Sequence, residues 1–107
     1  MNYKIILTPN FQKEFKKLGK KYPSLKANLI ELTNSLLEHP IQGSEVFKNC
    51  YKIRFAIKSK GRGKSGGGRL INYVRISNEK IYLLSVYDKS EKDTVSDEYI
   101  KFLLKDL

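Results

Sequence analysis

The chain has 107 residues, a length that suits one domain with a single hydrophobic core. Its 21 Lys and Arg residues against 11 Asp and Glu residues give a formal charge of +10, which favours a polyanionic partner such as nucleic acid. A single cysteine, Cys50, excludes an internal disulfide and a Cys/His metal cluster, and no apolar run reaches the roughly 18 residues of a membrane span. We therefore expect a cytoplasmic protein without a metal, a cofactor or a membrane segment, in which Cys50 is a small buried residue.

The first half of the chain predicts a short strand followed by two helices. The strand covers about residues 3–8, after which Thr8 and Pro9 supply an N-cap and a first helical residue. The first helix is expected to break within residues 19–23, and the second to end at His39, which precedes a proline and caps the helix. Apolar side chains recur at helical spacing in both segments: Phe11, Phe15, Leu18 and Tyr22 in the first, and Leu25, Leu29, Leu32 and Leu36 in the second.

The second half predicts three strands and a closing helix. Apolar and basic residues alternate with a period of two from residue 50 to 58, and two further strands are expected at about 69–76 and 80–87, in an antiparallel meander. A helix follows with Thr94 or Ser96 as its N-cap and an apolar stripe that includes Ile100. The predicted fold is α+β: an N-terminal strand and a two-helix hairpin packed on one face of a small antiparallel sheet, with a C-terminal helix.

The segment KSKGRGKSGGGR, residues 58–69, contains a G-x-G-x-x-G spacing and the tripeptide GKS of a P-loop. Both nucleotide-binding motifs require a helix directly after the glycines, whereas a strand is expected here. We therefore interpret the segment as a flexible, basic hairpin connection. Its cations are better suited to contacts with RNA phosphates than to catalysis: Lys58, Lys60, Arg62 and Lys64.

Residues 46–78 contain no acidic residue but nine Lys and Arg residues. Lys52 and Arg54 are expected on one face of their strand, about 7 Å apart, with Arg69 at the start of the partner strand. The expected neighbours of this cationic surface are Tyr73, Tyr87 and Lys89. Cations that track phosphates beside aromatic rings suit single-stranded nucleic acid, although a sheet face merely solvated by its cations is the alternative.

Three segments resemble RelE-type toxins of type II toxin–antitoxin systems: Cys50-Tyr-Lys-Ile-Arg54, Arg69-Leu-Ile-x-Tyr73, and residues 81–90, Ile-Tyr-Leu-Leu-Ser-Val-Tyr-Asp-Lys-Ser. The resemblance extends over nearly the whole chain, and the Gly-rich insertion is similar to the HigB branch. It implies one RelE-like toxin domain over residues 1–107. Such a toxin enters the ribosomal A site, cleaves the mRNA there and is neutralised by a cognate antitoxin protein.

The resemblance also implies a metal-independent reaction, in which the RNA 2′-hydroxyl attacks the adjacent phosphate. Lys52 is then the candidate base, which needs a lowered pKa to accept a proton, while Arg54 and Arg69 stabilise the phosphorane. Ser90 and Ser96 stand where better-studied relatives have an arginine and a tyrosine. The candidates to replace those two residues are Lys89 or Lys92 as general acid and Tyr87 as the aromatic residue.

Two other functions fit the same sequence. Related ParE toxins share the architecture but bind and poison DNA gyrase, and a noncatalytic RNA-binding domain would also be basic. The combination of Lys52, Arg54 and Arg69 favours the nuclease. Since Arg69 is expected to be an exposed cation at a strand end, Arg69→Ala should abolish toxicity and leave the fold intact.

Overall fold

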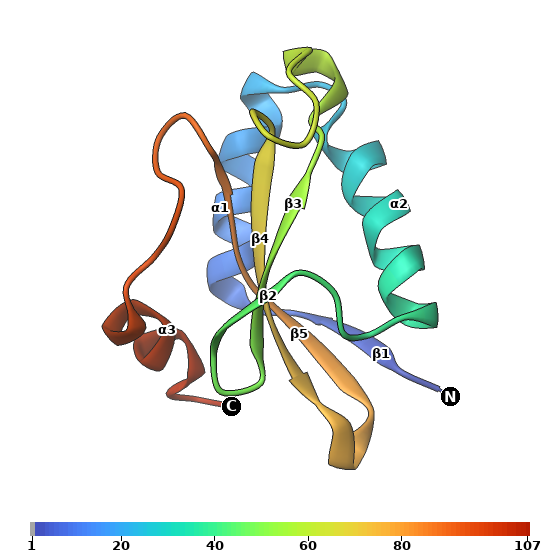
Figure 1. Cartoon of the computed structure of the whole chain (residues 1–107), viewed down its shortest axis with the longest axis vertical. Coiled ribbons are helices and arrows are strands. Elements are labelled where there is room, and N and C mark those ends of the chain that lie inside the picture. The colour runs from blue at the N-terminus through green and yellow to red at the C-terminus, as the bar shows by residue number, and fades with distance from the viewer. Residues whose placement is uncertain (1) are drawn as a thin grey trace.

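The computed structural model describes residues 2–107, in which a central sheet carries helices on both faces (Figure 1). The strand order is β1-β5-β4-β3-β2. Strands β3 (Cys50–Phe55), β4 (Gly68–Arg75) and β5 (Lys80–Asp88) pair in antiparallel fashion, which confirms the predicted meander and the α+β fold.

The two edge strands differ from the sequence expectation. Strand β1 (Lys4–Leu7) joins the sheet parallel to β5, so the sheet is mixed rather than purely antiparallel. Strand β2 (Ser44–Phe47) was not predicted; it pairs antiparallel with β3 through a register shift. Strand β2 has only four residues, too few for a two-residue period to be recognised in the sequence, whereas β1 was expected as a strand and only its parallel pairing was not.

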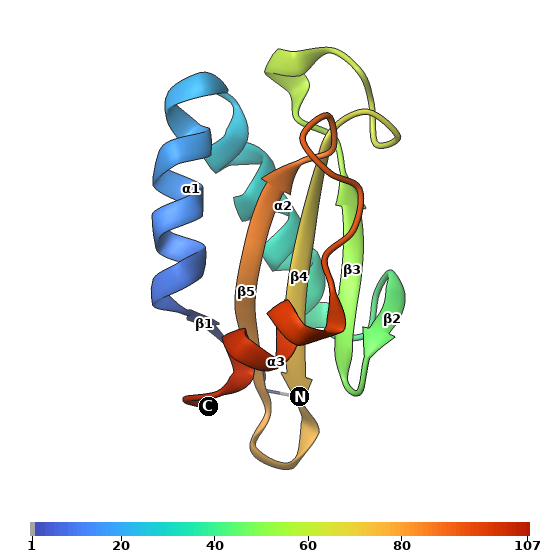
Figure 2. The same cartoon turned by 90° about the vertical axis from the view of Figure 1, so that its left-hand side faces the viewer.

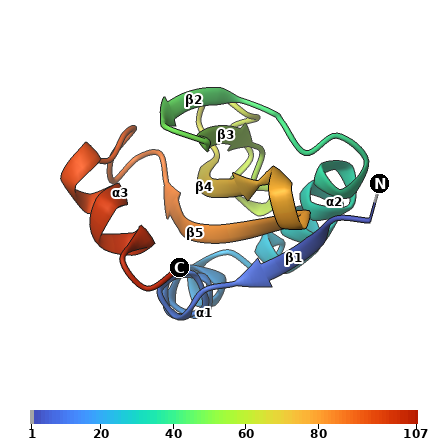
Figure 3. The ribbon, with the colours of Figure 1, turned by 90° about the horizontal axis from the view of Figure 1, so that it is seen from below.

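Helices α1 (Pro9–Lys21) and α2 (Leu25–Glu38) cover one face of the sheet, as predicted. The Thr8 side chain accepts a hydrogen bond from the backbone N–H of Phe11, and His39 is the C-cap of α2, so both expected helix boundaries are confirmed. The apolar stripes of the helices pack with buried residues of β3, β4 and β5 and with the partly buried Ile5 of β1 in one core cluster. Figure 3 shows the two helices and the sheet from below.

Helix α3 (Asp97–Leu104) lies on the opposite face (Figure 2). The Ser96 side chain caps it by accepting from the N–H of Tyr99, and the buried Ile100 packs with Cys50 of β3 and with buried residues of β4 and β5. Residues 89–96 connect β5 to this helix and run across the same face. The face that carries α3 therefore contains a second, smaller core around Ile100 and, next to it, the polar segment of residues 89–96.

The Gly-rich connection between β3 and β4 is more firmly anchored than the predicted flexible loop. It begins with a 3-10 turn, Lys58–Lys60, whose first N–H donates to the Asn28 side chain at 3.0 Å. A Cβ atom at Gly67 would lie 2.3 Å from the Phe55 carbonyl oxygen, so this position requires glycine for the close approach of two backbone segments. Strand β4 follows directly, which agrees with the interpretation that the glycines form no nucleotide cradle.

Candidate active site

The structure brings Arg54, Arg69 and Tyr87 into one row across the sheet. Arg54 on β3 is directly opposite Arg69 on β4, which is directly opposite Tyr87 on β5. Lys52 lies two residues before Arg54 and therefore on the same face, opposite Ile71. This is the face that carries α3, and four of the six predicted catalytic residues meet on it.

Arg69 is buried, with 1% of its surface exposed, so the expectation of an exposed strand-end cation is wrong. Its Nη1 donates to the carbonyl oxygens of Lys64 and Gly68, each at 3.0 Å, and its Nη2 donates to that of Ser65 at 3.2 Å. The Nε donates to the Asp93 carboxylate at 3.1 Å. The end of the Gly-rich connection and the segment that contains Asp93 thus both bind the guanidinium, which holds these two segments against β4.

Asp93 is the residue of the site that the sequence analysis missed. Its carbonyl oxygen accepts hydrogen bonds from Lys52 Nζ at 3.1 Å and from the Tyr87 hydroxyl at 3.2 Å, while its carboxylate holds Arg69. Partial burial would raise the pKa of Asp93, but the charges of Lys52 and Arg69 outweigh it and hold this pKa below its ordinary value. The sequence contains one signal for such a residue. Residues 46–78 have no acidic residue, so a cation of this segment that becomes buried needs a counter-ion from another part of the chain.

Tyr87 is a buried hydrogen-bond donor in this site, since 4% of its surface is exposed. Burial, followed by the charge of Asp93, raises the pKa of its hydroxyl to about 12, so the group stays protonated at neutral pH. The Lys92 ammonium lies 5.1 Å from the centre of the Tyr87 ring, a cation–π distance. Lys92 therefore approaches the same site from residues 89–96.

Lys60, a predicted RNA contact, is turned inward to the buried carboxylate of Asp88. Its Nζ lies 2.5 Å from Asp88 Oδ1, and the Tyr22 hydroxyl donates to Oδ2 at the same distance. Burial alone would raise the pKa of Asp88, but these hydrogen bonds outweigh it and hold the pKa far below its ordinary value. Lys60 thus links the Gly-rich connection to β5.

The other predicted RNA contacts divide into two groups. Lys58, Arg62 and Lys64 are exposed on the Gly-rich connection, and Lys58 and Lys64 line, with Arg54, a hollow of about 250 Å³ beside α2. Tyr73 lies four residues beyond Arg69 on β4, about 13 Å along the strand. There its ring stacks on Tyr82, so it is not a neighbour of the cationic row.

Lys89, a predicted candidate for the general acid, is exposed directly after β5. Its backbone N–H donates to the carbonyl oxygen of Gly67 at 3.0 Å, which joins residues 89–96 to the Gly-rich connection. Within residues 2–107, no cluster of three or more His, Cys, Asp or Glu side chains could hold a metal ion. No helix in the described part of the chain is both long and apolar enough to span a bilayer.

Comparisons with known proteins agree with this fold. The family model described as "ParE toxin of type II toxin-antitoxin system, parDE" matches residues 5–92. A mutant of the Escherichia coli toxin RelE in the free state has a TM-score of 0.63 and 24% identity, and covers 87% of this chain and 90% of its own. The isolated E. coli RelE toxin has a TM-score of 0.61 and 22% identity, and covers 98% of this chain and 99% of its own.

A further solved structure, an E. coli RelE mutant bound to an antitoxin RelBc peptide, has a TM-score of 0.62 and 22% identity, and covers 91% of this chain and 98% of its own. At these identities the solved structures support the fold, whereas the family model spans most of the sequence. The chain therefore belongs to the ParE toxin family, within the RelE/ParE superfamily of type II toxins.

Proposed function

We propose that this toxin is a metal-independent endoribonuclease that cleaves mRNA in the ribosomal A site and so inhibits translation. The observation that carries the proposal is the row of Arg54, Arg69 and Tyr87 with Lys52 beside it. Cations gathered at one place on a sheet can stabilise the extra negative charge of a phosphorane, the charge that develops in the transition state of this reaction.

The reaction can be assigned to groups on this face. Lys52, as a neutral amine, takes the proton of the 2′-hydroxyl while O2′ attacks phosphorus and the bond from phosphorus to O5′ breaks. Arg54 and Arg69 stabilise the phosphorane that forms. Lys92 or Lys89 returns a proton to O5′, and Tyr87 donates a hydrogen bond, so the products are a 2′,3′-cyclic phosphate and a 5′-hydroxyl.

An RNA phosphate would reach Arg69 by replacing the Asp93 carboxylate at its Nε. Asp93 also covers Lys52 and Tyr87 through its carbonyl oxygen, so residues 89–96 must shift for all three groups to contact RNA together. The site lacks a His/Glu pair for proton transfer. Positioning of the RNA by the ribosome would supply much of the rate, and cleavage is therefore expected to depend on the ribosome.

The partners follow from this proposal: a translating ribosome, its mRNA and a cognate antitoxin protein, all in the cytoplasm. The structure of E. coli RelE with an antitoxin peptide is the precedent for the last of these. Since the toxin carries a charge of +10, we expect the antitoxin segment to be acidic and to fold on binding. It would cover the cationic row or displace α3.

A second candidate function is gyrase inhibition by binding, and the match to the ParE family model favours it. It predicts that supercoiling by purified gyrase stops on addition of the toxin and that mRNA stays intact. It gives no role to the cationic row, so neutral substitutions there would leave that inhibition unchanged.

The decisive experiment incubates the purified toxin with ribosomes that translate a defined mRNA, and maps new RNA ends by primer extension. We expect new ends within the A-site codon, none on naked mRNA, and a rate roughly 100-fold or more lower for Arg54→Ala. Lys20→Ala removes an exposed lysine of α1 that belongs neither to the cationic row nor to its neighbours, and is the control. Intact mRNA together with blocked supercoiling would replace the nuclease by the gyrase inhibitor, and RNA binding without either effect would leave a noncatalytic RNA-binding toxin.

A further inference from the structure

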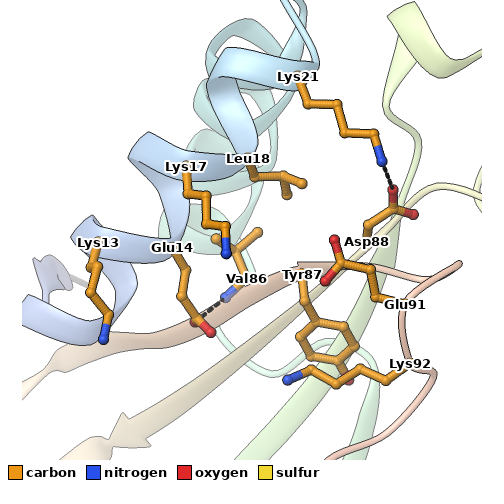
Figure 4. Close-up of a pocket in the computed structure, with 10 residues that line it drawn as sticks. All are labelled: Lys13, Glu14, Lys17, Leu18, Lys21, Val86, Tyr87, Asp88, Glu91 and Lys92. Atoms are coloured by element: carbon orange, nitrogen blue, oxygen red, sulfur yellow. Dashed lines mark hydrogen bonds and ion pairs between the residues drawn. The ribbon is translucent and has the colours of Figure 1, made fainter.

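A groove next to the cationic row lies between α1 and the end of β5 (Figure 4). It encloses about 470 Å³. Leu18, Val86 and Tyr87 supply its apolar lining. Lys13, Lys17 and Lys21 project from α1 above it, while Lys92 approaches from the other side, on the segment that follows β5. Lysines that only keep a helix surface solvated do not need to surround a hollow, so the position of these lysines around the groove suggests a binding role.

Two lysines of the groove, Lys13 and Lys17, are free to bind a ligand. Of its three carboxylates, those of Glu14 and Asp88 are already occupied, and the third, that of Glu91, is exposed. Glu14 Oε1 accepts from Ser85 Oγ at 2.7 Å and from the backbone N–H of Val86 at 3.2 Å. Asp88 is neutralised by Lys60. In the described part of the chain, Lys13 and Lys17 form no ion pair, and Lys21 only reaches Asp88 at 3.9 Å.

The groove is continuous with the candidate active site at Tyr87 and Lys92. Tyr87 lines the groove, yet its hydroxyl donates to the Asp93 carbonyl and its backbone lies opposite Arg69. Lys92 stands over the Tyr87 ring between the two regions. A strand bound at Arg69 could therefore continue past Tyr87 and under α1 without leaving the positively charged surface.

We propose that this groove binds the sugar–phosphate backbone of the RNA strand next to the cleaved bond. Lys13 and Lys17 are one helical turn apart, about 5–6 Å between their Cβ atoms, and contact successive phosphates. Lys92 contacts the phosphate nearest to Tyr87, and a ribose packs on the apolar lining. The proposal rests on the nuclease function for the identity of the strand, but it concerns binding and can be tested without cleavage.

The chain offers a matched control for this proposal. Lys13→Gln/Lys17→Gln removes two charges from the groove, whereas Lys16→Gln/Lys20→Gln removes two charges from exposed positions of the same helix that do not line it. Gln keeps the helix propensity close to that of Lys, so both variants should fold. Their net charges are equal, and any difference between them reports position rather than overall charge.

The probe is a fluorescein-labelled 2′-O-methyl RNA of about 12 nucleotides, which cannot attack its own phosphates, titrated by fluorescence anisotropy over a range of salt concentrations. For Lys13→Gln/Lys17→Gln we expect about tenfold weaker binding at 0.1 M salt and a slope of log K against log salt smaller in magnitude by about 1.4, two phosphate contacts at 0.7 each. The control should stay close to the unsubstituted protein. Equal losses in the two variants would overturn the groove as a specific RNA contact.

Two further measurements separate this proposal from its alternatives. Poly-L-glutamate replaces RNA in the same titration, and if it distinguishes the two variants as strongly as RNA does, the groove binds acidic protein segments and the proposal fails. Cleavage by the unsubstituted toxin on translating ribosomes tests the nuclease independently. A toxin that cleaves mRNA while both variants bind RNA alike refutes only the groove, and one that loses RNA binding with the groove lysines but never cleaves refutes only the nuclease.

Discussion

Replacing Asp88 by Asn tests whether the buried carboxylate holds the Gly-rich connection onto the sheet. The Asp88 side chain has no exposed surface and binds Lys60 Nζ and the Tyr22 hydroxyl, and the Lys60 side chain is itself 12% exposed. Asn keeps an acceptor but leaves the Lys60 ammonium without its counter-ion. Breaking one partner of a buried ion pair costs roughly 3–5 kcal/mol. For a domain of this size, that lowers the Tm by roughly 12–20 °C.

The stabilisation by Asp88 should depend on pH in a defined direction. The folded pKa of Asp88 is lowered, so its contribution to stability is fully present above the ordinary carboxyl pKa, about 4, and is lost as the pH falls through the folded value. The Tm difference between the unsubstituted protein and Asp88→Asn should be constant from about pH 5 to 8 and shrink below about pH 4. Calorimetry at several pH values measures it, with the exposed Glu91→Gln as the control. A Tm at pH 7 within about 3 °C of the unsubstituted protein would refute the assigned role of the pair.

Three further substitutions test other parts of the structure. Arg69→Ala should lower the free energy of unfolding by roughly 3 kcal/mol or more, because four hydrogen bonds from a buried cation are lost, and an unchanged urea midpoint would contradict this. Asn72 is fully buried and its side-chain amide finds no partner within residues 2–107, so Asn72→Leu should raise the free energy of unfolding by about 1–3 kcal/mol in the same assay. Asp93→Asn should bind the 2′-O-methyl RNA severalfold more tightly and Asp97→Asn, with the same change of charge, should not; weaker binding by Asp93→Asn would show that Asp93 helps to hold RNA rather than to exclude it.

The main elements of the fold could be predicted because their sequence periods are long and clear. The stripe that begins at Phe11 and the alternation from residue 50 each extend over several residues, and Thr8-Pro9 marks a helix start by capping chemistry. The parallel position of β1 could not be predicted in this way. Its four residues pair with a strand about 75 positions later, and nothing local specifies that contact.

The candidate site was only partly predictable, for a different reason. Alternation places Lys52 and Arg54 on one face of β3, and antiparallel pairing places Arg69 near them. Alternation does not reveal which cation is covered by a loop. Arg69 is buried and Lys60 half-buried by segments whose path depends on tertiary contacts, with Asp93 and Asp88 as their counter-ions. A sequence rich in unpaired cations thus overstates how many are free to bind a partner.

The positions of the free cations indicate that the RNA-binding surface extends beyond the row on the sheet. Arg54, Lys58 and Lys64 are available at the edge beside α2, and Lys13 and Lys17 on the far side of Tyr87. Between them Arg69 is fixed by carbonyl groups and Asp93, so it can contribute a rigid charge but few new hydrogen bonds. A fixed charge at the reacting phosphate favours catalysis, because backbone carbonyl groups already hold the guanidinium in place and only Asp93 has to give way, whereas affinity for the strand must come from the exposed cations on either side. Substitutions at Arg69 should therefore reduce the cleavage rate more than RNA affinity, and substitutions at Lys13 and Lys17 should do the reverse.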